Sequence, residues 1–552
     1  MTENVQQSFF DISAVELISI EAAADLARVS SATIRNWIKA GHIPLAARGF
    51  TDRDMLTLFM AGKEGEKRLT SRANKSKKDE HDHELFSLNF IGALDDPSTS
   101  FKQISDRYEQ GLSESYRNKE GIYYTPPEVV TNFLDFSDVG VENLTFLDPC
   151  CGSGNFLVRA LELGFRPENV YGYDTDPNAV EITKRRILAK AGYATENVVH
   201  EDFLAASMSF GLPKFDVIFT NPPWGKKIDK DQKSRFAKFF GAGGSVDTCS
   251  LFMFASLSRL KDGGYLGLLL PDAFFNIAVF ESARIRALNL GIKKLTDYGK
   301  PFKGLLTKAV GVVLRNESTM SCNEDIICTT KNHTYKRSSN SFAKNPKSII
   351  NFQAQPEAAY IIEHLLGVRH VTLARKAKWG LGVVTGNNEK FISDRPGKGL
   401  MPVYRGADIT SGGLLPPSCF IPENLSLYQQ VAPVELYEAP AKLIYKFISS
   451  GLCFFPDLEQ RYVLNSINMV IPDADLGVSH AQIVSLLNSE VINWLFSSLF
   501  STHKILRTDL ESLPLHVDYF KQHAVFSEEN YLKFLCLEKD KNGTFRIKKS
   551  NY

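Results

Sequence analysis

Short apolar runs, each closed by polar or glycine-containing residues, mark the middle of the chain. The clearest runs cover residues 145–147, 170–173, 215–220 and 265–270, and each has the length of a buried β-strand rather than that of a membrane span. After the first run, a glycine-containing turn leads into the start of a helix. This order of strand, turn and helix predicts an α/β protein built from βαβ units.

Candidate ligand-binding residues follow the predicted strands. Asp148 precedes a glycine-containing turn at 150–154, where glycine lets the backbone bend tightly and approach a ligand. Asp174 ends the next strand about twenty residues later, the spacing at which a carboxylate meets ribose hydroxyls in nucleotide-binding units. Asp202 and Phe203 follow a third strand-like stretch. Because ligands of open α/β sheets bind at the carboxyl ends of strands, we expect one shared pocket.

The tetrad Asn221-Pro222-Pro223-Trp224 follows the strand at 215–220. The side-chain carbonyl of Asn221 and the backbone carbonyl of Pro222 are two acceptors that can hold both hydrogens of a planar amino group. Trp224 offers a flat face on which a heteroaromatic ring can stack. This set suits the transfer of a group to an exocyclic amino nitrogen. A plain β-turn that closes the strand is the alternative, since Asn-Pro marks turns.

Three segments occur in a fixed order: Gly121-Ile122-Tyr123-Tyr124-Thr125-Pro126-Pro127, then Asp148-Pro149-Cys150-Cys151-Gly152-Ser153-Gly154, then the tetrad. Together they resemble the S-adenosylmethionine-dependent DNA adenine-N6 methyltransferases in the gamma ordering of motifs. The resemblance covers residues 115–320 and, more loosely, the C-terminal part. It implies a Rossmann-like methyltransferase domain with a mixed, mostly parallel seven-stranded sheet, and a C-terminal α+β target-recognition domain.

The same resemblance implies an activity. The family transfers a methyl group from S-adenosylmethionine to N6 of an adenine flipped out of double-stranded DNA, in the cytoplasm, as part of a type II restriction–modification system with a separate restriction endonuclease. The cofactor carries the activated methyl group, so the protein supplies positioning and no covalent enzyme intermediate is needed. The alternatives are methylation of a protein glutamine or an RNA base, and a DNA-binding regulator with an inactive methyltransferase core.

Individual roles carry over to the residues that match the family's motifs. Thr125 is expected to bind the methionine carboxylate of the cofactor, Asp174 its ribose hydroxyls, and Asp202 its adenine amino group. Phe302 is expected to cover the face of the target base opposite the tetrad's tryptophan, with Tyr298 as its competitor. The full set comprises Tyr124, Thr125, Asp148, Cys150, Gly152, Gly154, Asp174, Asp202 and Phe203 for the cofactor, and Asn221, Pro222, Pro223, Trp224 and Phe302 for catalysis.

The net charge of +1 gives no overall attraction to nucleic acid, so affinity for DNA must come from local basic patches. One patch follows the tetrad and is predicted to be a basic loop with a flexible, glycine-rich far end at 241–244; an ordinary solvated loop is the alternative. The expected DNA contacts are Lys226, Lys227, Lys230, Lys233, Arg235 and Lys238 here, and Arg405, Lys446, Arg461, His503, Lys504 and Arg507 in the C-terminal part.

The first 60 residues form a separate predicted module. Residues 20–28 and 33–40 have the pattern of two short helices around a turn, and a short wing follows. This resembles the MerR-type winged helix-turn-helix; a helical packing module without DNA contact is the alternative. The residues of the second helix that are expected to face DNA are Thr33, Arg35, Asn36 and Lys39.

These segments divide the chain. The predicted parts are a helix-turn-helix module at 1–60, a charged linker and helical lead-in at 61–115, the catalytic domain at 116–320, a connector at 321–369 and a target-recognition domain at 370–552. Within the connector we expect an irregular stretch or a short hairpin. Eight cysteines without C-x-x-C spacing predict neither a zinc site nor a disulfide framework, and no signal peptide is recognised. We therefore expect no metal and no membrane partner, whereas the recognised DNA sequence and the oligomeric state stay open.

Overall fold

The computed structural model describes residues 16–61 and 101–548, except residues 28, 30, 40–41, 48, 113–116, 118–119, 137–139, 303–304, 318–324, 411 and 501–503. Most of the predicted charged linker and lead-in, at 62–100, therefore lies outside the described residues, as do His503 and the side chains of Asn36 and Lys39.

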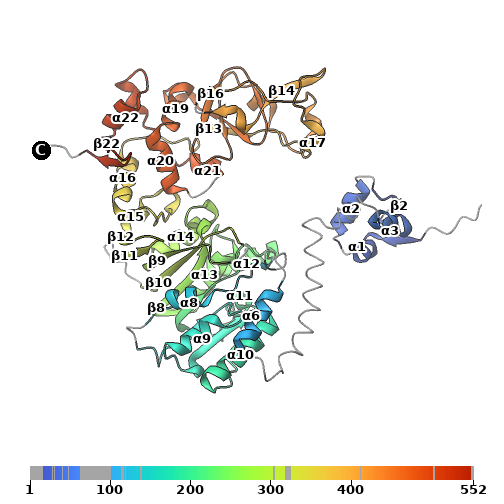
Figure 1. Ribbon diagram of the computed structural model, residues 1–552, viewed down its shortest axis with the longest axis vertical. Helices are drawn as coiled ribbons and strands as arrows, with labels where there is room; N and C mark the ends of the chain where they lie inside the picture. Colours follow the sequence, from blue (N-terminus) through green and yellow to red (C-terminus); the bar gives the residue numbers. More distant parts are fainter. Residues whose placement is uncertain are drawn as a thin grey trace, which may run out of the picture.

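Three short helices and a small sheet make up the N-terminal module (Figure 1). Its elements are β1 (Leu17–Ser19), α1 (Ile20–Ala27), α2 (Ser31–Lys39), β2 (Leu45–Ala47), β3 (Phe50–Asp52) and α3 (Arg53–Ala61), with β3 between β1 and β2. Helix α2 begins at Ser31, earlier than predicted, and β2 and β3 occupy the place of the predicted wing. Arg35 is exposed and pairs with Glu21 at 3.4 Å, and Thr33 is half-buried. Contact with DNA stays a prediction.

A nine-stranded sheet, called the central sheet below, runs through the middle of residues 146–338 (Figure 1). Its strands, in chain order, are β4 (Phe146–Asp148), β5 (Val170–Asp174), β6 (Val198–His200), β7 (Phe215–Thr220), β8 (Leu260–Pro271), β9 (Gly291–Gly299), β10 (Ala309–Arg315), β11 (Asp325–Thr329) and β12 (Thr334–Ser338). Their order in space is β12-β11-β9-β10-β8-β7-β4-β5-β6. Strands β6, β5, β4, β7 and β8 are parallel, and β10 is antiparallel to both of its neighbours.

The sheet has two strands more than the seven that were predicted. The additional pair is the hairpin β11–β12, and β11 joins the edge of the sheet by parallel pairing with β9. The hairpin lies in the stretch that was expected to be irregular or a short hairpin, so the second alternative is confirmed. The predicted α/β class with a mostly parallel sheet is also confirmed.

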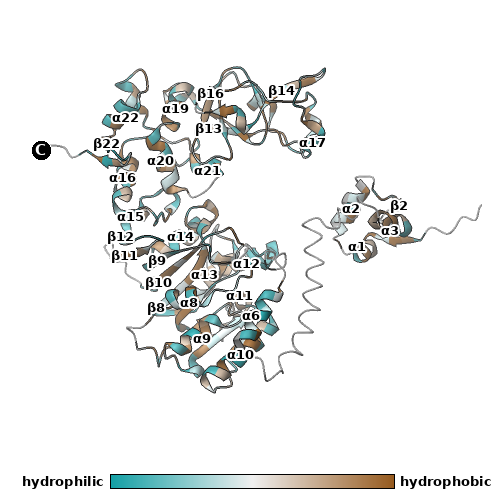
Figure 2. Cartoon of the chain, in the orientation of Figure 1, coloured by the Kyte–Doolittle hydropathy of each residue, from teal (hydrophilic) through white to brown (hydrophobic). Residues whose placement is uncertain are grey.

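The two faces of the sheet bury separate cores, because neighbouring residues of a strand point to opposite sides. In β7, Val217 and Phe219 belong to one core and Ile218 to the other. Figure 2 shows apolar residues concentrated on the central strands. The flanking helices are α6 (Phe101–Gly111), α8 (Pro127–Phe133), α9 (Asn155–Glu162), α10 (Pro177–Ala191), α11 (Phe203–Ala206), α12 (Lys230–Phe240), α13 (Thr248–Ser258) and α14 (Glu281–Leu288).

Helix α12 corrects the prediction of a basic loop after the tetrad. The Asp229 carboxylate caps the helix by accepting from the backbone N–H groups of Asp231 (2.9 Å) and Gln232 (3.3 Å). Phe236 and Ala237 are buried and hold the helix against the catalytic core. The loop prediction was wrong because it counted the lysines and overlooked this cap and this apolar pair.

The C-terminal part combines short strands with helices, as predicted. One antiparallel sheet has the order β13 (Ala377–Leu381), β21 (Ile467–Pro472), β18 (Lys442–Lys446), β19 (Phe454–Asp457), and a second has the order β17 (Cys419–Pro422), β14 (Leu400–Tyr404), β20 (Tyr462–Val463) with β20 parallel to β14. The helices are α15 (Asn340–Ala343), α16 (Pro356–Gly367), α17 (Asn388–Phe391), α18 (Val434–Tyr437), α19 (His480–Leu487), α20 (Glu490–Leu499), α21 (Arg507–Leu510) and α22 (Glu528–Phe534), and the small pairs are β15–β16 (Ile409–Thr410, Gly413–Leu414) and β22–β23 (Leu537–Lys539, Phe545–Ile547).

Helix α16 lies within the predicted connector, yet it packs into the C-terminal core. Its buried residues Ile361, Ile362 and Leu365 belong to the same apolar cluster as helices α19 and α20. The interval 321–369 therefore contributes strands to the central sheet and a helix to the C-terminal core.

A buried ion pair links the neighbouring strands β18 and β19 of the C-terminal part. Lys442 Nζ lies 2.6 Å from Asp457 Oδ2, and both side chains are fully buried. Asp457 also accepts from the guanidinium of Arg461 (2.8 Å) and from two backbone N–H groups. Burial opposes ionisation of Asp457, but the Lys442 ammonium and these hydrogen bonds hold the pKa of the carboxyl below its usual value. Arg461, which was expected to contact DNA, is thus engaged inside the fold.

We expect Asp457→Ala to lower the free energy of unfolding by about 3–5 kcal/mol, because it leaves the buried Lys442 ammonium without its carboxylate partner. Amide hydrogen exchange of β18 and β19 measures this locally. The matched control is Asp475→Ala, which removes an exposed pair with Lys376 (3.4 Å) and should cost less than about 1 kcal/mol. Equal effects of the two substitutions would contradict this assignment. The pKa of Asp457 is lower in the folded protein than the value of about 3.9 for an unfolded aspartate. The stabilisation that the Asp457 carboxylate provides is therefore complete above about pH 3.9, and it is lost as the pH falls through the lower pKa of the folded protein.

Candidate active site

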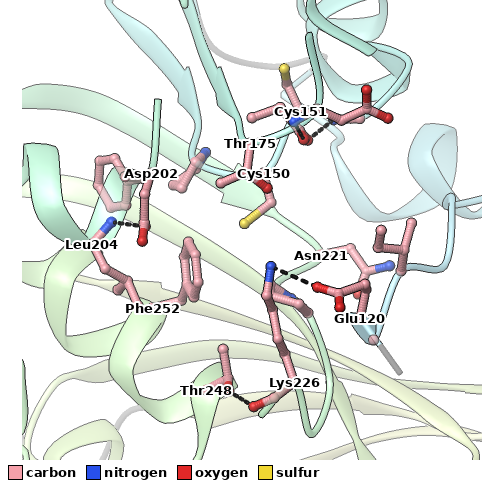
Figure 3. Close-up of a pocket in the computed structure, with 18 of the residues that line it drawn as sticks. Glu120, Cys150, Cys151, Thr175, Asp202, Leu204, Asn221, Lys226, Thr248 and Phe252 are labelled. Carbon is pink, nitrogen blue, oxygen red and sulfur yellow. Dashed lines mark hydrogen bonds and ion pairs between the residues drawn. The ribbon is translucent and has the colours of Figure 1, made fainter. Parts of the chain in front are cut away.

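A cavity of about 260 Å³ lies at the carboxyl ends of β4, β5 and β7 (Figure 3). Most of the residues that the sequence assigned to a cofactor line it. These are Tyr124, Thr125, Asp148, Cys150, Gly152, Asp174, Asp202 and Phe203. Asn221, Pro223, Lys226 and Lys227 line it as well, whereas Gly154, Pro222, Trp224 and Phe302 are not among its lining residues. The strand ends therefore converge on one pocket, as expected from the parallel sheet.

The glycine turn is tightly packed. Gly152 has φ +49°, and a Cβ at this position would lie 2.7 Å from Cε1 of Tyr124. Thr183 donates to the Gly152 carbonyl (2.8 Å), which fixes the turn from the side of α10. Gly154 is the N-cap of α9 with φ +86°, and a Cβ at this position would lie 2.8 Å from Cγ2 of Thr183. Glycine at these two positions thus serves both the backbone conformation and the close approach of neighbours.

Two carboxylates face the turn, of which Asp148 is buried and Asp174 is half-buried. Asp148 Oδ1 accepts from the backbone N–H of Cys150 (3.1 Å), while Oδ2 is buried without a hydrogen-bond partner. Burial raises the pKa of Asp148 to about 7, and the nearby Thr220 hydroxyl offsets part of this rise. Oδ2 still has no hydrogen-bond partner. Asp174 accepts from the backbone N–H groups of Gly152 (2.8 Å) and Asp176 (2.9 Å), and burial raises its pKa to about 6. The pair can receive a cationic or hydroxyl-bearing ligand.

An aromatic pair lies beside Asp202 in the cavity. Asp202 caps α11 by accepting from the N–H of Leu204 (2.9 Å), and the ring of Phe203 is fully buried. Phe252 of α13 stacks on Phe203 at 6.2 Å and 21°, and it faces the cavity beside Asp202 (Figure 3). Sequence reasoning missed Phe252, because α13 is buried from Thr248 to Ser256 and no polar face singles out one residue.

The side-chain amide of Asn221 is held in one orientation. Its Nδ2 donates to the backbone carbonyl of Tyr123 (2.7 Å), whereas Oδ1 is buried without a hydrogen-bond partner. Trp224 donates from its backbone N–H to the carbonyl of Gly121 (3.3 Å), so the tetrad packs along residues 121–123. The one unused polar atom of the amide is therefore an acceptor, which suits an incoming amino group.

The aromatic residues expected on the two faces of a base contact each other. Trp224 and Phe302 lie edge to face at 5.3 Å and 86°, and the indole N–H donates to the carbonyl of Leu269 (3.1 Å). Phe302 is buried and also contacts the ring of Tyr123 at 5.7 Å. The competitor Tyr298 donates its hydroxyl to Asn132 (2.9 Å) of α8, so Phe302 is the residue that meets the tryptophan. A base can enter between Trp224 and Phe302 only if this pair separates.

The basic residues occupy different places. Lys226 pairs with Glu120 at 3.1 Å within the wall of the cavity, whereas Lys227 is exposed at its rim. On α12, Lys230, Arg235 and Lys238 are exposed and Lys233 is half-buried. In the C-terminal part, Arg405 and Lys504 are exposed, Lys446 is half-buried, and Arg507 is exposed and pairs with Glu511 (2.8 Å). The C-terminal residues do not line the cavity, and their contact with DNA stays a prediction.

Helix α6 holds the glycine turn from the outside. Ser153 donates to the carboxylate of Glu109 (2.6 Å), and the hydroxyl of Tyr108 donates to Asp176. Burial raises the pKa of Glu109 above its usual value. Sequence reasoning predicted helices in this lead-in but had no signal for their contact with the cavity, because the partners lie far apart along the chain.

Comparisons with known proteins give consistent matches. A family model described as N-6 DNA Methylase matches residues 100–288, and one described as TaqI-like C-terminal specificity domain matches residues 401–515. The type II methyltransferase M.VspI of Vibrio sp. (strain 343) is 46% identical over 411 residues, which cover 74% of this chain and 100% of that enzyme.

Two solved structures share the fold. A cryo-EM structure of the DrdV–DNA complex has a TM-score of 0.52 at 13% identity and covers 91% of this chain and 70% of that chain. The type IIL restriction-modification enzyme MmeI, solved in complex with DNA, has a TM-score of 0.50 at 12% identity and covers 75% and 69%. At such identities the likeness shows the fold alone.

The described residues contain neither a candidate membrane span nor a candidate metal-binding cluster. Across residues 16–61 and 101–548, with the gaps given above, no helix is long and apolar enough to cross a membrane. The same part of the chain has no group of three or more His, Cys, Asp or Glu side chains that could hold a metal ion.

We expect Gly152→Ala to destabilise the catalytic domain by about 1–3 kcal/mol more than Gly192→Ala, because only the first adds a clash with Tyr124. Gly192 is the matched control, since it has φ +64° and open space around its Cβ position, so that an alanine meets backbone strain alone. Urea unfolding of the two variants, monitored by hydrogen exchange of α9 and α10, measures the difference in stability. Equal losses would mean that the turn is not closely packed against Tyr124.

Proposed function

Because the chain belongs to the N-6 DNA methylase family of type II methyltransferases, we propose that it transfers a methyl group from S-adenosylmethionine to N6 of an adenine in double-stranded DNA. The modification would protect a specific site from a cognate restriction endonuclease. The observation that carries the proposal is the buried, unpartnered Oδ1 of Asn221 beside a cavity lined by the glycine turn and carboxylates.

The cavity fits S-adenosylmethionine on two observations. Asp148 Oδ2 is a buried acceptor without a partner, as an incoming ammonium requires, and the glycine turn has no room for a side chain at Gly152. In this proposal Asp148 and the turn hold the amino-acid part, with the methionine carboxylate on Thr125, and Asp174 binds the ribose. Asp202, Phe203 and Phe252 receive the adenine ring. When bound, the cofactor supplies a methyl group that is already activated on sulfur.

The target base is proposed to bind next to Asn221. Its exocyclic amino group would donate one hydrogen to Asn221 Oδ1 and the other to the Pro222 carbonyl, which aims the nitrogen lone pair along the line of transfer. The base must leave the DNA stack to reach this position. Separation of Trp224 from Phe302 would open the space between them, and the two rings would then stack on the flipped adenine.

DNA recognition is assigned to the parts outside the cavity. The segment 401–515 matches a specificity domain, which favours a DNA site over a free protein side chain or an RNA base as the substrate. Proposed phosphate or base contacts are Lys227, Lys230, Lys233, Arg235, Arg405, Lys446, Lys504 and Arg507. The chain is proposed to have the gamma order of motifs, and the N-terminal module is proposed to be a MerR-like DNA-binding element.

We expect Asn221→Ala to lower the rate of methyl transfer by about a hundredfold or more, because it removes the acceptor that positions the amino group. Cofactor affinity should change by less than about threefold, since Asn221 is not assigned to the cofactor. Transfer of labelled methyl to DNA measures the first, and calorimetric titration with S-adenosylmethionine measures the second. Asn197→Ala is the matched control, because Asn197 also donates to a backbone carbonyl (2.8 Å) but lies outside the cavity. Normal turnover of Asn221→Ala would overturn the assigned role.

Cofactor binding should weaken as the pH falls below about 7, because Asp148 must be ionised to pair with the cofactor ammonium. The pKa of this acid is raised to about 7, so the carboxylate is charged above that pH and becomes protonated below it. The affinity for the cofactor should then fall by up to about tenfold for each pH unit below 7. Titrations between about pH 5 and pH 7.5 test this. Asp148→Asn should lose the dependence near pH 7 and keep only that of Asp174 near pH 6. A flat profile of the unmodified protein would show that Asp148 does not bind a cation.

A further inference from the structure

An ion pair between Glu120 and Lys226 forms part of the cavity wall (Figure 3). Lys226 Nζ lies 3.1 Å from Glu120 Oε2, and the side chains are 30% and 22% exposed. Both residues line the cavity, so the pair is partly removed from water and faces the space that is proposed to hold the cofactor. In such a place, charges interact more strongly than on an open surface.

The backbones on both sides of the pair are fixed. Asn221 Nδ2 donates to the carbonyl of Tyr123, and the N–H of Trp224 donates to the carbonyl of Gly121. Residues 120–123 and 221–226 therefore run side by side in opposite directions. The ion pair is the third contact between these two segments, after the two hydrogen bonds. The Thr248 hydroxyl donates to the carbonyl of Lys226 (2.7 Å) and fixes that end. The pair is thus positioned by the fold, and it adjoins the amide that is proposed to hold the target base.

The cavity is rich in carboxylates. Its lining includes Glu120, Asp148, Asp174, Asp176, Glu201 and Asp202, against the ammonium groups of Lys226 and Lys227. The charge of Lys226 acts on Asp174, which also lines the cavity. Burial raises the pKa of Asp174 to about 6, and the Lys226 ammonium opposes that rise. An unpaired Lys226 would therefore oppose the field that the carboxylates provide for a cation.

We propose that Glu120 is a specificity-determining residue that neutralises Lys226 and so lets the cavity favour a cationic methyl donor over its uncharged-sulfur product. This inference rests on the proposed function. S-adenosylmethionine carries a sulfonium, whereas S-adenosylhomocysteine lacks the transferred methyl group and carries a neutral thioether, with the remaining groups in common. A change in local charge therefore alters the affinity for the first and leaves the second nearly unchanged, whereas a loss of packing alters both.

The two single variants should shift the ratio of the two affinities in opposite directions, and the double variant should restore it. Glu120→Gln leaves one positive charge and should raise the ratio of the dissociation constants for S-adenosylmethionine and S-adenosylhomocysteine by about fivefold to tenfold. Lys226→Met leaves one negative charge and should lower the ratio. The double variant has no net charge at this place and should return the ratio to within about twofold of the unmodified protein.

Calorimetric titration of the full chain with each of the two ligands measures the ratio without any turnover. The matched control is Glu196→Gln, which breaks an ion pair with Lys184 (3.3 Å) outside the cavity and should leave the ratio unchanged. If Glu120→Gln does not fold, Lys226→Met still tests the sign of the shift.

Three results would count against the inference. An unchanged ratio in both single variants, or a parallel weakening of both ligands, would show that the pair only supports the fold. A double variant that fails to restore the ratio would show that the charges do not act through each other. If the unmodified protein binds neither ligand, the proposed function itself fails, and that outcome is separate from a failure in the variants alone.

Discussion

The hydrogen bond from Asn221 Nδ2 to the Tyr123 carbonyl is the constraint on which the active site depends. It fixes the Nδ2 end of the amide toward that carbonyl and leaves Oδ1 as a buried acceptor. A side-chain amide that could turn over would offer a donor or an acceptor and would not select an amino group. The bond also joins the end of β7 to the segment that precedes the glycine turn, so the proposed target site and cofactor site share one wall.

Two aromatic residues close the space that the proposed function assigns to the target base. Trp224 and Phe302 contact each other edge to face, an arrangement worth about 0.5–1.5 kcal/mol beyond the buried area. This contact energy is small compared with the few kcal/mol that extraction of a base from a duplex costs. The ring contact is therefore only a weak barrier to a base that has already left the stack. Stacking on both rings would return part of that cost. The closed pair also keeps apolar surface from water while no base is bound.

Local sequence signals predicted the strands, the glycine turn and the carboxylates at the strand ends, because each depends on a few neighbouring residues. The contacts of Phe252, Tyr108 and Glu109 with the site could not be predicted, since their partners come from distant parts of the chain. Lys226 was read as one of a run of lysines, and only the fold shows its partner Glu120. The helical state of α12 could have been predicted from Asp229 and the apolar pair Phe236 and Ala237. The two additional strands lie in a polar stretch whose pairing with β9 has no signature in the sequence.

The central claim is that the acceptor at Asn221 directs a methyl group to the exocyclic nitrogen of adenine in DNA. Mass spectrometry of nucleosides tests it most directly, applied to DNA from cells that lack their own adenine methylation and express this chain. The account predicts N6-methyldeoxyadenosine in that DNA and none in DNA from cells without the chain. Methylated cytosine in its place, or no modified base in cells that contain the folded protein, would contradict it.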